Sequence, residues 1–270
     1  MAKFDPIRSP NAIDQAVFVI GLSKNIGKDN VDAIKGLKDR LASEFDEFND
    51  IHMMGIELSP DGLNKPDKQV VGVECKTETK EQEHLLVAKR PDWLLRISEN
   101  SIQINCLNYA GWGQAVGHVG HLLEILFESL TTTLEGVSII EITFQVNDMF
   151  IVSDADEGID YSQLFNRSKY LNENIWGAGV LWHLHSGWFE SDDRAGNVLS
   201  VLNISTRTEV TIPDKHIVLV EHLQKSTVDN GLSIEINKTE IEGLFGVLHE
   251  KNKILVSDLF SDDIKGRIGL

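Results

Sequence analysis

The sequence predicts an α+β protein of two lobes, with antiparallel sheets each packed against helices and a C-terminal helix. Two long helical stripes of apolar residues, separated by runs of adjacent strand-like segments, predict this class. Strands that follow one another without intervening helices favour antiparallel pairing over a doubly wound parallel sheet. The 270 residues, of which 41% are hydrophobic, are enough for a well-buried core.

The first predicted elements are a strand and a helix. Residues 16–22, AVFVIGL, form a β-rich run that is followed by a polar turn. Apolar residues then recur at spacings of three and four from Val31 to Phe48, which predicts one continuous helix with Asn30 as its N-cap. The intervening GLSKNIGKD lacks phosphate-loop spacing, because five residues rather than four precede its Gly-Lys pair. It is therefore predicted to be a plain turn.

More strands and a second helix complete the first half of the chain. A long helix is predicted over residues 114–134, where leucines and valines form one apolar stripe. Gly136 is a suitable residue to end this helix. Two of the strands flank Glu99 and Asn100 and should form a hairpin. The predicted strands of this half are residues 51–58, 70–77, 93–97, 101–107 and 137–146.

The second half is predicted to be a β-rich lobe. Residues 151–176 are polar and acidic without periodicity, so they are expected to link an N-terminal α+β lobe at 1–150 to a C-terminal lobe at 177–270. A closing helix is predicted from about Lys238, with Asn237 as its cap. The predicted strands of this lobe are residues 180–190, 198–208 and 216–226.

Composition excludes several classes of protein. No apolar run reaches the ~20 residues that a bilayer span needs, and the N-terminus lacks a secretory signal. Cys75 and Cys106 each lie in a strand-like run and are predicted to be buried thiols, which favours a cytoplasmic protein. A net charge of −17 disfavours binding to nucleic acid or to a membrane. It is explained either by solubility or by a protein partner with a basic face.

The sharpest candidate for chemistry is the segment WHLHSGWFE. His183 and His185 are two residues apart on a predicted strand, so both imidazoles point to the same face of the sheet. They are candidate ligands for a divalent transition metal, with Glu190 as a third candidate. Trp182 and Trp188 share the run, so packing or a contact surface is the simpler explanation. No other cofactor is predicted.

Two further clusters are weaker candidates. His118 and His121 are three apart on the long predicted helix, with Glu124 on the next turn, and could share a face. The acidic run that contains Asp154 and Asp156 resembles a calcium loop, but its glycine is in the wrong register, so a solvated segment is predicted.

The order of features resembles a sporadically distributed bacterial family of uncharacterised proteins. The similarity consists of a strand hairpin that ends in Tyr-x-x-Trp, a long helix, a strand that ends in Asn, and a C-terminal Leu-His followed by Phe. The corresponding residues here are Tyr109, Trp112, Asn147, Leu248, His249 and Phe260. The chain departs from the family at Phe144 and Gln145, where an Arg-Tyr pair is typical. The resemblance implies a phage-defence or toxin–antitoxin-like accessory module by association.

These observations predict a non-catalytic, protein-binding accessory, sensor or neutralising subunit. The alternatives are a metal-dependent hydrolase that uses the His-x-His pair, and a small-ligand sensor with its pocket between the lobes. The partner is expected to dock on aromatic and acidic residues beside the linker and the tryptophan-rich strand. The predicted interaction residues are Tyr109, Trp112, Asp154, Asp156, Trp182, Trp188, Asp192 and Asp193.

Overall fold

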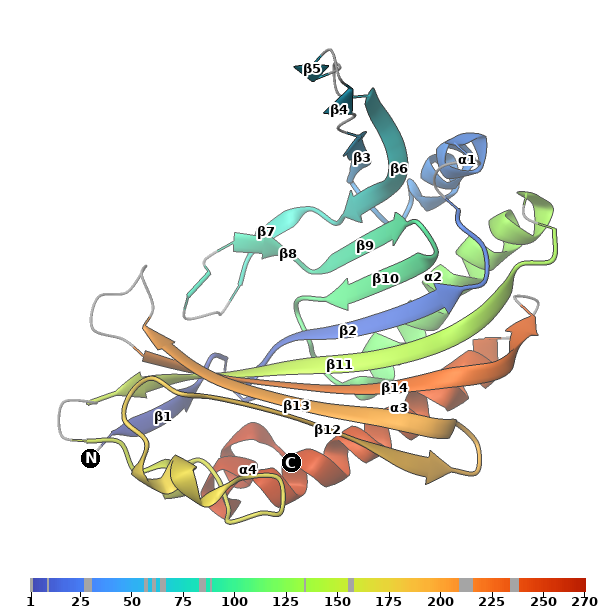
Figure 1. The fold of residues 1–270 in the computed structure, drawn as a ribbon. Helices are drawn as coiled ribbons and strands as arrows, with labels where there is room; N and C mark the ends of the chain where they lie inside the picture. The colour runs from blue at the N-terminus through green and yellow to red at the C-terminus, as the bar shows by residue number, and fades with distance from the viewer. Residues whose placement is uncertain are drawn as a thin grey trace.

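One antiparallel sheet of ten strands organises the protein. The strand order is β12-β13-β14-β11-β2-β10-β9-β6-β3, and β1 also pairs with β11 (Figure 1). The computed structural model describes residues 2–8, 10–26, 31–55, 58–59, 62–63, 67–82, 86–87, 89–133, 135–154, 158–208, 216–233 and 238–270. The predicted caps Asn30 and Asn237 lie outside these residues.

The strands of the large sheet are joined by hairpins, by two helical connections and, between β11 and β12, by a segment with 3-10 turns. These strands are β1 (Lys3–Pro6), β2 (Ile13–Leu22), β3 (Glu47–Gly55), β6 (Asp67–Lys76), β9 (Trp93–Ser98), β10 (Ser101–Cys106), β11 (Ser138–Ser153), β12 (His183–Asp192), β13 (Gly196–Thr208) and β14 (His216–Ser233). Two short hairpins are formed by β4 (Leu58–Ser59) with β5 (Gly62–Leu63), and by β7 (Thr79–Glu81) with β8 (Lys89–Pro91).

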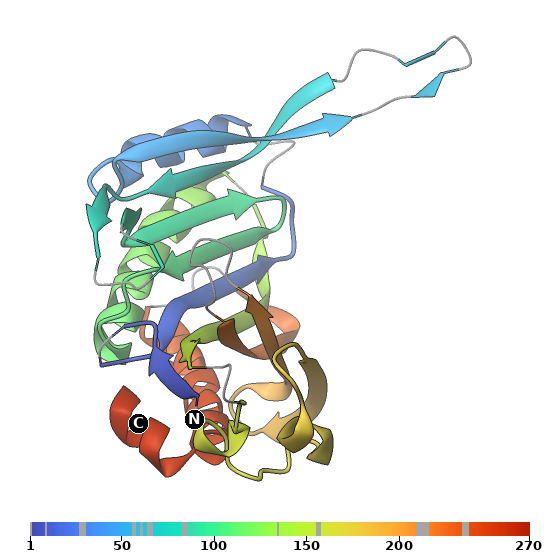
Figure 2. The same ribbon diagram turned by 90° about the vertical axis from the view of Figure 1, so that its left-hand side faces the viewer.

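The main helices lie on one face of the sheet (Figures 1 and 2). Helix α1 contacts β6, and α3 contacts both β11 and β14. Helix α2 lies between α1 and α3 and contacts both. The helices are α1 (Val31–Leu41), α2 (Trp112–Thr133), α3 (Lys238–Leu259) and α4 (Asp262–Ile268), with 3-10 turns η2 (Tyr161–Gln163) and η3 (Glu173–Gly177). None of the described helices is long and apolar enough to cross a membrane.

The α+β class is confirmed, but the strands of both predicted lobes belong to a single sheet rather than to one sheet each. Strand β11 pairs with β2 of the first half along one edge and with β14 of the second half along the other. A strand has two hydrogen-bonding edges, so one long strand can join both halves. The predicted strand at 137–146 continues to Ser153, and this extension provides much of the β11–β14 pairing.

The described part of the segment predicted as an acidic linker is packed against the rest of the protein. Residues 151–153 are the end of β11, and the turns η2 and η3 follow. Tyr161, Leu164, Phe165 and Ile175 are buried in a core that includes the end of α3 and α4. These apolar residues have no regular spacing, so periodicity could not reveal their burial.

Several predicted elements are confirmed. The β9–β10 hairpin pairs Ser98 with Ser101, and α2 and α3 lie close to their predicted positions. Helix α1 ends at Leu41 instead of continuing to Phe48, because that apolar stripe proceeds through a turn into β3. Cys75 and Cys106 are free and buried. Burial raises the pKa of each thiol to about 12, which makes them poor nucleophiles.

Candidate functional site

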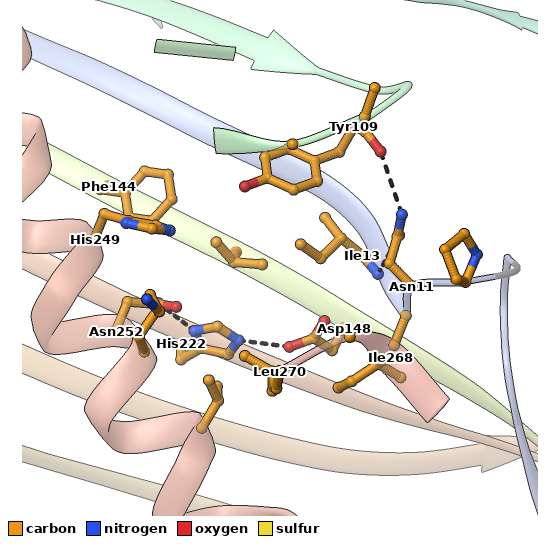
Figure 3. A pocket seen from close by; sticks show the side chains of 18 residues that line it. Asn11, Ile13, Tyr109, Phe144, Asp148, His222, His249, Asn252, Ile268 and Leu270 are labelled. Carbon is orange, nitrogen blue, oxygen red and sulfur yellow. Dashed lines mark hydrogen bonds and ion pairs between the residues drawn. The ribbon is translucent and has the colours of Figure 1, made fainter. Parts of the chain in front are cut away.

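A cavity of about 370 Å³ lies on the helix-covered face of the sheet, where the two halves of the chain meet (Figure 3). Its walls come from the β1–β2 connection and the start of β2, from the β10–α2 connection, from β11 and β14, and from α3, the end of α4 and the residues that follow it. The lining residues are Pro10, Asn11, Ala12, Ile13, Tyr109, Ala110, Gly111, Phe144, Val146, Asp148, His222, His249, Asn252, Lys253, Val256, Ile268, Gly269 and Leu270.

The floor of the cavity is a chain of buried polar side chains. Asp148 Oδ2 lies 2.8 Å from His222 Nε2, and His222 Nδ1 contacts Asn252 Nδ2. Asn252 Nδ2 also donates to Gln224 Oε1 at 3.0 Å. All four residues are buried, with His222 1% exposed. Buried polar groups of this kind are stable only when hydrogen-bonded, so the network fixes the positions of β11, β14 and α3 at this point.

The network determines which atoms remain open to a ligand. His222 Nδ1 faces the Asn252 amide, which also contacts Gln224, and His222 Nε2 faces the Asp148 carboxylate. Both ring nitrogens of His222 are thus engaged. The other carboxylate oxygen, Asp148 Oδ1, has no hydrogen-bond partner among the described residues.

His249 forms a second wall of the cavity. Its ring stacks on Trp112 with centroids 3.9 Å apart and planes within 7°, and it meets Phe144 edge-on. Burial, opposed by Glu250 and reinforced by Lys253, lowers the pKa of His249 to about 4, so the ring is neutral near pH 7. Its Nδ1 is buried and has no hydrogen bond within the described chain.

Tyr109 faces the polar floor from the opposite side. Figure 3 shows its phenol reaching into the cavity, and burial raises its pKa to about 12. Its backbone carbonyl accepts from Asn11 Nδ2 at 3.3 Å, while Asn11 Oδ1 accepts from the Ile13 amide at 3.1 Å. Asn11 therefore ties the two connections that flank the cavity, and holds the Tyr109 backbone in place.

The arrangement is suited to binding more than to nucleophilic chemistry. No serine, threonine or cysteine lines the cavity in the described part of the chain. His222 cannot serve as a general base without breaking its hydrogen bonds, and the Tyr109 phenol holds its proton near pH 7. What the cavity offers a ligand is a carboxylate oxygen, a neutral imidazole, a phenol and apolar surface.

Three residues that carry the family resemblance meet at this site. Tyr109 and His249 line the cavity, and Trp112 supports His249 by stacking. Phe260 packs elsewhere, against Phe150 and Phe165 in the second core. The shared residues from the hairpin and from the C-terminal helix are therefore spatial neighbours, although 136 residues lie between Trp112 and His249 in the sequence.

The residues proposed as metal ligands do not converge. His183 and His185 are exposed on one face of β12, whereas Glu190 is on the opposite face because side chains alternate along a strand. Glu190 instead accepts from Trp188 Nε1 at 3.1 Å and lies 3.6 Å from Lys251 Nζ. No group of three metal-ligating side chains occurs among the residues that the structure describes.

The other histidine pair is also separated. His118 packs against Trp93, with ring centroids 4.3 Å apart, and burial lowers its pKa. His121 Nε2 lies 3.3 Å from Glu44 Oε1 instead. Each histidine has its own contacts with neighbouring elements, so they do not form a site with Glu124.

The acidic residues proposed as one docking face lie at opposite ends of the strands. Asp154 follows the end of β11, whereas Asp192 and Asp193 lie at the β12–β13 turn, beyond Glu190, which is level with Ile142 near the start of β11. Asp154 is twelve residues from Ile142, so this turn lies roughly 40 Å or more from Asp154 at about 3.3 Å per residue. Asp156 lies outside the described residues.

The two tryptophans of the β12 region pack inward. Trp182 meets Tyr161 edge-on at 5.2 Å, and Trp188 stacks on Tyr170 at 4.9 Å. Both partners belong to the segment at 151–176. The tryptophans therefore anchor that segment against the sheet, and their rings are only partly accessible to another molecule.

Sequence reasoning missed Asp148, His222 and Asn252. The alternation of the strands could have identified two of them. Asp148 lies on the same inward-facing side of β11 as Phe144 and Val146. His222 likewise follows Val218 and Val220 on the inward side of β14. A polar residue at an inward position of an apolar strand requires a buried partner, which marks it as a candidate site residue.

Comparison with known proteins finds no family model that matches the chain and no curated protein similar to it.

Proposed function

We propose that the protein binds a small organic ligand in the cavity between its two halves and acts as a ligand sensor. One observation carries this proposal: a buried hydrogen-bond network presents Asp148 Oδ1, without a partner among the described residues, to a cavity of about 370 Å³. A ligand that donates to this oxygen would form a charge-assisted hydrogen bond, which contributes about 1.5–3 kcal/mol. The volume lies within the usual range for small-molecule sites, about 300–1,000 Å³.

The position of the cavity suits a sensor. Its walls combine β11, which is shared by both halves, with α3 and with the connection that leads into α2. A ligand in contact with all of them would stabilise their packing and shift any equilibrium between closed and looser arrangements.

A fragment screen by ligand-observed NMR tests this proposal. Ala110 is exposed at the edge of the cavity, so Ala110→Trp should obstruct the cavity without disturbing the core. Ser191→Trp, on the exposed face of β12, is the matched control. We expect fragments that bind the wild type and the control but not Ala110→Trp. A screen with no hits, or with hits that Ala110→Trp does not affect, would overturn the proposal.

A second candidate function is the docking of another protein along β12. This strand is at one edge of the large sheet, where Phe189 is 74% exposed and the preceding Leu181 is 67% exposed. Exposed edge strands can accept a further strand from a partner. The net charge of −17 supports a partner with a basic face.

Affinity purification with matched variants tests the docking candidate. We expect a stoichiometric partner to be retained by the wild type and by Ile254→Ser, which alters a residue of α3 that is 67% exposed. Phe189→Ser should lose that partner. Its association rate should fall as ionic strength rises, and a salt-independent rate would contradict a basic partner.

A further inference from the structure

The charges at the cavity are unequal in their exposure. Asp148 and Lys253 are the acidic and basic side chains that line it. The Lys253 side chain is 49% exposed, and its Nζ lies 3.8 Å from Glu250 Oε1. Its charge is therefore at the surface, where it is solvated and paired with Glu250. The Asp148 side chain is 6% exposed and contacts His222 through Oδ2, and Asn252 contacts His222 from the other side. The acidic group that the interior of the cavity presents to a ligand is therefore the Asp148 carboxylate, through Oδ1.

The cavity does not have enough ligands to hold a metal ion. The cavity offers a single carboxylate, and no set of three metal-ligating side chains occurs in the described part of the chain. Divalent cations require several oxygen or nitrogen ligands, typically four for zinc and six or more for calcium. A phosphate-bearing ligand fits no better, because the buried carboxylate would repel it and no arginine lines the cavity among the described residues.

The walls suit an organic cation. Tyr109, Phe144 and His249 present rings to the cavity, and Trp112 backs His249. An ammonium group near an aromatic face gains about 0.5–2 kcal/mol, and the rings also bury the apolar part of such a ligand. The net charge of the chain raises the local concentration of cations.

We propose that the cavity recognises a small primary amine, whose ammonium group donates to Asp148 Oδ1 while its apolar body lies between Tyr109 and His249. This assignment rests on the proposed ligand-binding function and names its ligand class. Asp148 Oδ1 is the charged acceptor within the cavity that lacks a partner among the described residues, so it selects a cationic donor over a neutral one. The volume of about 370 Å³ favours a single-ring or short-chain amine over a nucleotide-sized molecule.

Matched probes separate an amine site from a general apolar pocket. The probes are 2-phenylethylamine, cyclohexylamine and butylamine, each compared with its alcohol and with a carboxylate of similar length, by ligand-observed NMR on the full chain. We expect at least one amine to bind about tenfold more tightly than its alcohol, which corresponds to about 1.4 kcal/mol. No carboxylate should bind. Alcohols that bind as tightly as amines, or an amine panel without a binder, would overturn this ligand class.

Two variants assign the recognition to named residues. Asp148→Asn preserves the shape and an acceptor for His222, so it should fold and reduce amine affinity to that of the alcohol while alcohol affinity stays unchanged. Tyr109→Leu removes the aromatic face from a half-buried position and should weaken amine binding about threefold to fivefold. Unchanged amine affinity in Asp148→Asn would sink the proposal even if Tyr109→Leu had the expected effect.

Failure of the amine proposal and failure of ligand binding can be distinguished. If alcohols bind as tightly as amines and Ala110→Trp abolishes both, the cavity is a site for neutral ligands, so the ligand class is wrong and the proposed function stands. If every probe binds Ala110→Trp as well as it binds the wild type, binding does not occur in the cavity, and both proposals are wrong.

Discussion

The cavity and the β12 edge both contain histidines of the same sheet, and their surroundings make them different. His222 is 1% exposed, and both its ring nitrogens are engaged by Asp148 and Asn252. His183 and His185 are exposed on the outer face of β12, with no third ligand beside them. The comparison shows that the spacing of histidines along one strand says less about function than the partners that other elements supply.

The largest expected difference in stability is between substitutions of the buried His222 and of the exposed His185. His222→Leu should lower the free energy of unfolding by about 3–5 kcal/mol, because it leaves the buried Asp148 carboxylate and the Asn252 amide without their partner. His185→Leu makes the same substitution at an exposed position of β12 and should change stability by less than about 0.5 kcal/mol. Urea denaturation of both variants checks this, and similar values for the two would refute the described network.

Apolar residues should show the same contrast between interior and edge. Leu41 and Leu126 are fully buried in the core between the helices and the sheet, so substitution of either by Ala should cost about 2–5 kcal/mol. Phe189 is larger but 74% exposed on β12, and Phe189→Ala should cost less than about 0.5 kcal/mol. Thermal denaturation gives the order of the three, and a loss for Phe189→Ala comparable to that for Leu126→Ala would place Phe189 in a buried interface.

The protonation of His249 provides a pH-dependent test of the cavity wall. Its pKa is about 4 in the folded protein and about 6.5 in the unfolded chain, so between these values the unfolded chain binds a proton that the folded protein does not. Stability should therefore fall as pH decreases from about 6.5 to 4, by about 2–3 kcal/mol from this residue. Below about pH 4 both states are protonated and this loss is complete.

A variant isolates the His249 contribution from that of other histidines. Burial lowers the pKa of His118 as well, so the wild type alone does not identify the group. His249→Phe keeps a ring against Trp112 but cannot titrate, so its stability should depend less on pH between 6.5 and 4. His121→Phe, which removes a half-exposed histidine of α2, is the control and should retain the wild-type dependence. Equal slopes for His249→Phe and the wild type would contradict the assignment.

Most of the secondary structure was predictable because local patterns determine it. Alternation and turn residues located the β9–β10 hairpin, and apolar stripes located α2 and α3. The joining of both halves into one sheet was not predictable in this way. It depends on which strands bind the two edges of β11, and strand pairing between segments distant in sequence leaves no periodic trace.

The site was less accessible to sequence reasoning than the fold. The resemblance singles out Tyr109, Trp112 and His249, but their meeting depends on α2 and α3 lying side by side. Asp148 and His222 give no motif, because each is a single polar residue on an apolar, inward face of its strand. The β12 residues, in contrast, form a motif because they are close together in the sequence. The alternation of a strand already placed Glu190 on the face opposite the two histidines.

The smallest expected effect concerns metal binding at β12. Two imidazoles on an exposed strand supply at most two ligands, whereas stable zinc sites use three or four protein ligands. We expect purified protein that has not met a chelator to contain well below one equivalent of transition metal. His183→Ala combined with His185→Ala should leave both metal content and the free energy of unfolding unchanged within about 0.5 kcal/mol. Stoichiometric zinc that this double variant loses, while Glu190→Gln retains it, would mean that other ligands complete a site on the outer face. The edge strand would then be a functional centre alongside the cavity.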